Sequence, residues 1–128
     1  MPESRTAERE TVPTAFAAPH VYVLAVVEGR DPSGVHRIDA SETVIGRGDQ
    51  AELRLDHDDE VSKRHCSIRV DGSVCSLIDL DSLNGTRLNC RSLRPGVPHR
   101  LRHLDELQIG ETRLLFLAGR FKPERIGD

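Results

Sequence analysis

The 128-residue sequence contains no tryptophan, and aromatic residues make up only 3% of it. A hydrophobic core must therefore consist mostly of valine, leucine and isoleucine. No apolar run approaches the roughly 20 residues that a membrane-spanning helix requires. The first residues, Met1–Arg5, are polar and mixed in charge, unlike the apolar centre of a signal peptide. These absences predict a cytoplasmic protein without membrane association.

The chain also lacks an excess of positive charge, since its formal net charge is −3 at pH 7. Nucleic-acid-binding domains usually carry a basic excess on one face. We therefore expect no nucleic-acid partner.

Cysteine is scarce, with Cys66, Cys75 and Cys90 as the three thiols. An odd number without a CxxC pair disfavours a disulfide framework. Cys66 and Cys75 fall inside predicted strands, so we expect them to be buried as small apolar side chains. A zinc site formed by the three cysteines and His65 is the alternative, but the spacing fits no usual zinc pattern. The prediction is that the protein holds no metal and no cofactor.

The length of the chain fits one domain, and its composition divides it into three parts. Residues 1–19 hold three prolines and many small or charged residues without a sustained period, which predicts a flexible N-terminal tail. Residues 20–118 alternate short apolar runs with turn-forming residues, as a folded domain does. Residues 119–128 form a short polar C-terminal tail.

The central part reads as about ten short strands, at the spacing expected of an all-β sandwich. Asp71-Gly72 and Asn84-Gly85 are strong hairpin-type turn signals, whereas 91–98 reads as an irregular connection. The predicted strands are 20–28, 35–39, 43–45, 52–55, 66–70, 73–80, 86–89, 99–104, 106–109 and 112–117.

Three polar loops follow predicted strands, and their donors suit a phosphate group. Arg47 has a planar fork of N–H groups that fits two phosphate oxygens at once. Ser62 adds a hydroxyl group and Lys63 a second cation, while the Asn84 amide both donates and accepts, as a peptide backbone requires. A phosphothreonine carries about two negative charges and three acceptor oxygens. If the strands form a sandwich, these loops meet at one end and match that ligand.

Other polar residues allow alternative interpretations. His65 would need Ser62 or Cys66 as a nucleophile to form a small hydrolase, but no oxyanion motif or triad accompanies it. We therefore expect a structural histidine and no catalytic residue. The acidic run 56–60 lacks the pattern of a calcium loop and is predicted to be a solvated loop. Asp79 and Asp81 are predicted to serve the chemistry of the adjacent turn.

Three motifs follow one another in the chain: Gly46-Arg47, then Ser62-x-x-His65, then Asn84-Gly85-Thr86 with Asn89 after it. In this order they resemble the forkhead-associated (FHA) domain, and the resemblance covers residues 20–118. The resemblance implies a sandwich of about eleven strands that binds phosphothreonine peptides through loops at one end. It implies that Leu83 stands where a serine or threonine can add a phosphate contact. The implied ligand contacts are Arg47, Ser62, Lys63 and Asn84, and the implied loop supports are Gly46, His65, Gly85 and Thr86.

The expected function is a phosphothreonine-peptide-binding adaptor or signalling module acting downstream of Ser/Thr kinases. Its partner would be a phosphothreonine-containing protein, such as a Ser/Thr kinase or its substrate. The alternative is a scaffold on the same fold that binds partners without phosphate. The layout also resembles small bacterial FHA proteins whose N-terminal tail is phosphorylated. Thr11 and Thr14 are therefore candidate phosphorylation sites, and the modified tail would occupy the protein's own binding site.

Overall fold

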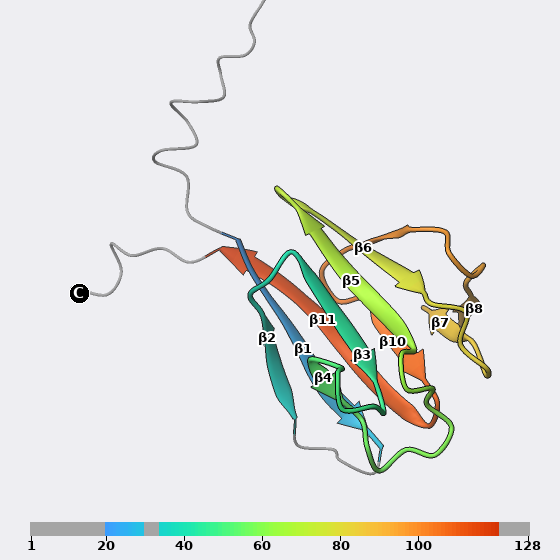
Figure 1. Ribbon diagram of the computed structural model, residues 1–128. Coiled ribbons are helices and arrows are strands. Elements are labelled where there is room, and N and C mark those ends of the chain that lie inside the picture. The colour runs from blue at the N-terminus through green and yellow to red at the C-terminus, as the bar shows by residue number, and fades with distance from the viewer. Residues whose placement is uncertain (1–19, 30–33, 121–128) are drawn as a thin grey trace, which may run out of the picture.

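A computed structural model describes residues 20–29 and 34–120. They form two sheets packed as a sandwich, and the predicted all-β fold with eleven strands is confirmed (Figure 1). The first sheet has six strands, in the order β2 (Val35–Ile38), β1 (His20–Glu28), β11 (Thr112–Arg120), β10 (Glu106–Ile109), β7 (Thr86–Leu88) and β8 (Arg91–Ser92). The second has five, in the order β4 (Leu53–Arg54), β3 (Glu42–Gly46), β5 (Cys66–Asp71), β6 (Val74–Asp79) and β9 (His99–Leu101).

Neighbouring strands pair antiparallel, except that β3 and β4 run parallel. The segment 91–98, predicted to be irregular, contributes the short strand β8. Asn89 and Cys90 join β7 to β8 with φ angles of 50° and 70°, so a two-residue turn closes this hairpin. Cysteine is not a usual residue for such a turn, which is why this hairpin was not predicted. Among the described residues, no helix has the length and apolar character needed to cross a membrane.

The core lies between the two sheets and is mostly aliphatic, as the composition predicted. Tyr22 and Phe116 are its aromatic members, with ring centroids 5.9 Å apart. Cys66 and Cys75 are buried, as predicted, and burial raises the pKa of both thiols, so they stay neutral. Cys90 is exposed at the tip of its hairpin. Nowhere in residues 20–29 and 34–120 do three or more His, Cys, Asp or Glu side chains gather as a metal site.

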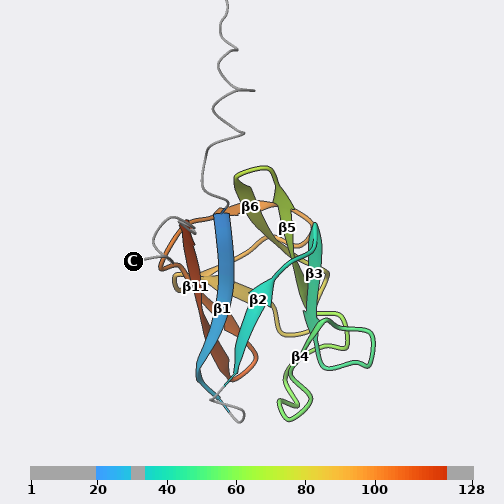
Figure 2. The ribbon, with the colours of Figure 1, turned by 90° about the vertical axis from the view of Figure 1, so that its left-hand side faces the viewer.

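Three loops lie at one end of the sandwich: the β3–β4 loop (47–52), the β4–β5 loop (55–65) and the β6–β7 loop (80–85). Figure 1 shows β3 and β6 ending toward these loops, and the turned view in Figure 2 separates the two layers of the sandwich. The Arg47 N–H donates to the Ser62 carbonyl at 2.9 Å. The Leu83 N–H donates to Ser62 Oγ at 3.0 Å. Hydrogen bonds therefore join all three loops, as the sequence predicted.

Candidate functional site

Arg47 directly follows β3, where the chain passes close to the β4–β5 loop. A Cβ atom on Gly46 would lie 2.0 Å from the Lys63 carbonyl oxygen, so this position accepts only glycine. Arg47 Nε donates to the Val61 carbonyl at 2.9 Å. The two terminal guanidinium nitrogens have no partner among the described residues, so they remain available to a ligand.

His65 is fully buried and joins the β4–β5 loop to the β6–β7 loop. Its Nδ1 atom accepts the Ser62 N–H at 3.0 Å, so the ring proton is on Nε2, which donates to the Gly85 carbonyl at 2.8 Å. Both ring nitrogens are therefore bonded to backbone groups. His65 therefore connects the two loops through hydrogen bonds to their backbones.

These contacts leave no nucleophile paired with His65. Ser62 Oγ accepts the Leu83 N–H, and His65 bonds the backbone of Ser62 and not its hydroxyl group. Cys66 is completely buried in the core, and burial raises the pKa of its thiol. The geometry thus provides neither of the nucleophiles that a hydrolase would require here.

Asn84 lies exposed on the β6–β7 loop, and its Nδ2 donates to the Glu60 carbonyl at 2.9 Å. This bond fixes the amide and leaves its Oδ1 atom available as an acceptor. Gly85 follows with φ at 84°, in the left-handed region that favours glycine. Leu83, on the other side, is 88% exposed, so an apolar side chain stands at the rim of the site.

Asp79 holds the β6–β7 loop together from inside. Its carboxylate is 1% exposed and accepts the Thr86 hydroxyl at 2.6 Å, the Ser82 hydroxyl at 2.5 Å and the Ser82 N–H at 3.1 Å. Ser82 Oγ in turn accepts the Gly85 N–H at 3.0 Å. Asp79 therefore has the turn role predicted for it, and Thr86 supports the loop through Asp79. Ser82 was not predicted, although an Asp-x-x-Ser spacing beside a turn is a usable signal.

Asp58 holds the β4–β5 loop, and the prediction that this acidic run is simply solvated is wrong at this position. Its carboxylate is 2% exposed. It accepts the Thr112 hydroxyl at 2.7 Å, the Glu111 N–H at 2.8 Å and the Glu60 N–H at 3.1 Å. The loop is thus anchored to the turn between β10 and β11. No local pattern marks Asp58, because two of its partners lie more than fifty residues along the chain.

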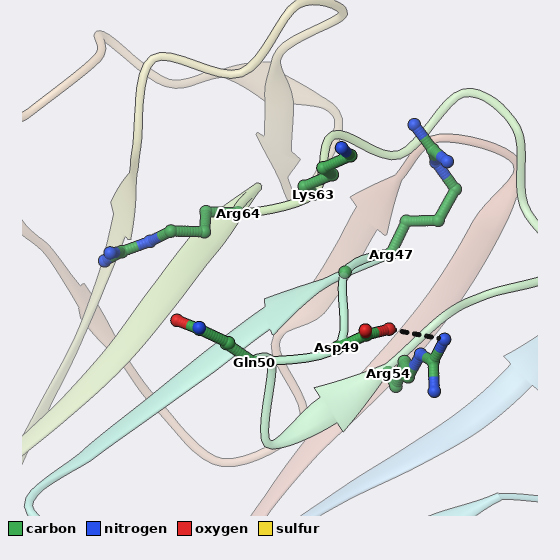
Figure 3. Close-up of a pocket in the computed structure, with 7 residues that line it drawn as sticks. Arg47, Asp49, Gln50, Arg54, Lys63 and Arg64 are labelled. Atoms are coloured by element: carbon green, nitrogen blue, oxygen red, sulfur yellow. Dashed lines mark ion pairs between the residues drawn. The ribbon is translucent and has the colours of Figure 1, made fainter.

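A basic hollow of about 510 Å³ lies beside Arg47, between the β3–β4 loop and the start of β5 (Figure 3). Asp49 and Arg54 form an ion pair of 2.9 Å within it. Lys63 and Arg64 are exposed and have no ion-pair partner in the described part of the chain. Three uncompensated cations, Arg47, Lys63 and Arg64, therefore line one surface, which suits an anionic ligand. The remaining lining residues are Gly48 and Gln50.

Comparisons with known proteins agree with this architecture. A chain from a structural and functional analysis of phosphothreonine-dependent FHA domain interactions superposes with a TM-score of 0.71 at 30% identity, covering 79% of this chain and 99% of that one. Two relatives are each 36% identical over 97 residues, or 76% of this chain. They are the glycogen accumulation regulator GarA of Mycolicibacterium smegmatis and the oxoglutarate dehydrogenase inhibitor of Corynebacterium efficiens.

The matched region spans 59% of the first relative and 66% of the second, so both relatives extend beyond it. The profile of the FHA domain family matches residues 43–110, which include all three loops of the site. The resemblance that the sequence motifs carry is therefore confirmed, and the chain belongs to the FHA domain family.

Proposed function

We propose that the protein is a phosphothreonine-peptide-binding adaptor that acts downstream of Ser/Thr kinases. The observation that carries this proposal is the position of the Arg47 guanidinium. Its Nε is held by the Val61 carbonyl, and its terminal nitrogens lie beside Lys63 without a partner in the part of the chain that the structure describes. A preorganised cation of this kind recognises a dianionic phosphate strongly, because little side-chain freedom is lost on binding.

In this proposal, Arg47, Ser62 and Lys63 bind the phosphate. Asn84 binds the peptide backbone, since its Nδ2 contact with Glu60 leaves Oδ1 for a peptide N–H. Gly46, His65, Gly85 and Thr86 act through loop shape and make no contact with the ligand. The predicted module of residues 20–118 is extended by strand β11 to Arg120, so the proposed binding module comprises residues 20–120 and the predicted C-terminal tail loses its first two residues.

The proposed partner is a phosphothreonine-containing protein, a Ser/Thr kinase or its substrate, met in the cytoplasm. Two relatives have regulatory names, one as a regulator of glycogen accumulation and one as an inhibitor of oxoglutarate dehydrogenase. They support a role in which binding, without catalysis, controls another protein. Thr11 and Thr14, the candidate phosphorylation sites, lie outside the described residues. Phosphorylation of that segment remains a proposed means of regulation.

The test is a binding screen with a degenerate phosphothreonine peptide library, followed by calorimetry on selected peptides in their phosphorylated and unphosphorylated forms. We expect measurable binding only with phosphate. Arg47→Ala should weaken binding by about 2–5 kcal/mol, the range for removing one partner of a close charge pair. Arg100→Ala, which changes an exposed arginine on strand β9 outside the three loops, is the matched control and should have no effect. Equal affinity for both peptide forms would reject the proposal in favour of a phosphate-independent scaffold.

A further inference from the structure

The basic hollow beside Arg47 carries more positive charge than one phosphothreonine would balance. Arg54 is paired with Asp49, so the uncompensated cations among the described residues that line it are Arg47, Lys63 and Arg64. The whole chain, by contrast, has a formal net charge of −3. A phosphothreonine supplies about two negative charges. One positive charge in the hollow would therefore have no counter-charge when the proposed ligand binds.

The positions of the three cations indicate that Arg64 is the one left over. The Gly48 N–H donates to the Lys63 carbonyl at 3.1 Å, which holds Lys63 beside the loop that carries Arg47. Figure 3 shows the Arg64 side chain extending away from that of Arg47, toward the side of the hollow on which Gln50 lies. A phosphate bound by Arg47 and Lys63 would therefore leave the Arg64 guanidinium unused.

The acidic residues of the β3–β4 loop do not neutralise Arg64. Asp49 is paired with Arg54 at 2.9 Å, and the Glu52 carboxylate accepts the Val44 N–H at 2.7 Å. Arg64 itself is exposed and has neither an ion pair nor a side-chain hydrogen bond within residues 20–29 and 34–120. Its guanidinium is therefore available to a group from outside the protein.

Arg64 also lines a separate hollow of about 580 Å³, where an anion is less favoured. The exposed carboxylate of Asp81 lines that second hollow and would repel a ligand carboxylate. In the basic hollow, the one carboxylate is that of Asp49, which is already paired. Gln50 is exposed there, and its amide N–H groups can donate to an anion. The charges therefore favour an anion on the Gln50 side of Arg64.

We propose that Arg64 and Gln50 form a second anion subsite, which binds an aspartate or glutamate side chain that flanks the phosphothreonine in the ligand. We call this pair of residues the flanking subsite. The inference rests on the proposed function, since it assigns a sequence preference to the same ligand. The Arg64 guanidinium would make charge-assisted hydrogen bonds to the carboxylate. Three cations would then meet about three negative charges, so the partner is a protein whose phosphothreonine lies in an acidic sequence.

The first experiment scans one phosphothreonine peptide with glutamate and, separately, with glutamine at each of about four positions on either side of the phosphothreonine. Calorimetry measures the affinity of each peptide. At one position, we expect glutamate to bind about two- to fivefold more tightly than glutamine, the effect of one exposed ion pair. At the other positions the two peptides should bind equally. A glutamate preference spread evenly over all positions would indicate general electrostatic attraction and would overturn the proposal.

The second experiment changes the flanking subsite and measures peptides with glutamate, glutamine or lysine at the preferred position. The wild type should prefer glutamate to lysine, and Arg64→Glu should reverse this order because the subsite becomes acidic. Arg100→Glu is the matched control, since it makes the same change of charge at an exposed position of β9 outside the three loops. It should keep the wild-type order. Thermal melting confirms that each variant is folded, and Arg64→Gln, which should lose the glutamate preference, replaces Arg64→Glu if that variant does not fold.

A wild-type protein that prefers glutamate at no position overturns the proposal. A folded Arg64→Glu or Arg64→Gln variant that keeps the wild-type preference also overturns it. In either case the proposed function stands as long as binding still requires the phosphate and Arg47. A wild-type protein that binds phosphorylated and unphosphorylated peptides equally would instead reject the proposed function, and this inference with it.

Discussion

Two loops beside the candidate site are each built around a buried aspartate, but the two aspartates bond partners at very different distances along the sequence. Asp79 bonds Ser82 and Thr86, which are three and seven residues away, so the β6–β7 loop is held by its own residues. Asp58 bonds Glu111 and Thr112, which are 53 and 54 residues away, so the β4–β5 loop is held by the opposite sheet. One carboxylate shapes a loop locally, and the other connects a loop to the rest of the domain.

This difference implies different consequences for stability and for binding. Loss of Asp58 detaches the β4–β5 loop from the turn between β10 and β11, so it removes a tertiary contact. Loss of Asp79 leaves the sheets intact but releases Ser82 and Gly85, which flank Leu83 and Asn84. We therefore expect Asp58 to contribute mainly to global stability and Asp79 mainly to ligand affinity.

The largest expected effect is that of Asp58→Ala. Three donors, from Glu60, Glu111 and Thr112, lose their acceptor, and each buried unsatisfied donor costs about 1–3 kcal/mol. We expect the free energy of unfolding to fall by about 3–5 kcal/mol, measured by urea denaturation. A loss below about 1 kcal/mol would show that water replaces the carboxylate and that the long-range anchor adds little.

Asp79→Ala should have a smaller effect on stability, about 2–3 kcal/mol, because Ser82 lies in a surface loop that can rearrange and only Thr86, at the start of β7, is a buried donor. Its effect on phosphothreonine-peptide affinity should be at least about tenfold, since Asn84 loses its fixed position. Calorimetry and urea denaturation on the same preparation measure both quantities. Asp58→Ala, assayed below its melting temperature, is the comparison. If both variants lose the same amount of binding free energy for each kcal/mol of lost stability, the two aspartates do not have different roles.

The threonines that donate to the two aspartates provide a finer test. Thr112→Val and Thr86→Val each remove one hydrogen bond to a charged acceptor, worth about 1.5–3 kcal/mol of unfolding free energy. Double-mutant cycles with Asp58→Asn and Asp79→Asn isolate each pairwise coupling. The Thr112–Asp58 coupling should be present in stability alone, whereas the Thr86–Asp79 coupling should also be measurable in peptide affinity. If both couplings affect affinity equally, the loops act as one unit.

The same difference in sequence separation explains which features could be predicted from the sequence. The strands followed from local apolar alternation, and the turn contacts of Asp79 followed from its place beside Asn84-Gly85. The order of the motifs around Arg47, Ser62 and Asn84 identified the family. Asp58 was predicted to be exposed to solvent because two of its partners are distant in sequence.

The strand β8 was missed for a different reason. Cys90 adopts a φ angle of 70°, which its residue type does not predict.

The exposed tip of the β7–β8 hairpin has a practical consequence. Cys90 is the one exposed thiol of three, and burial raises the pKa of the Cys66 and Cys75 thiols, which slows their reaction with electrophiles. A maleimide dye therefore has a single preferred attachment point on the native protein. That point lies one short strand away from the β6–β7 loop, so the unaltered sequence already contains a position for a fluorescent reporter of ligand binding.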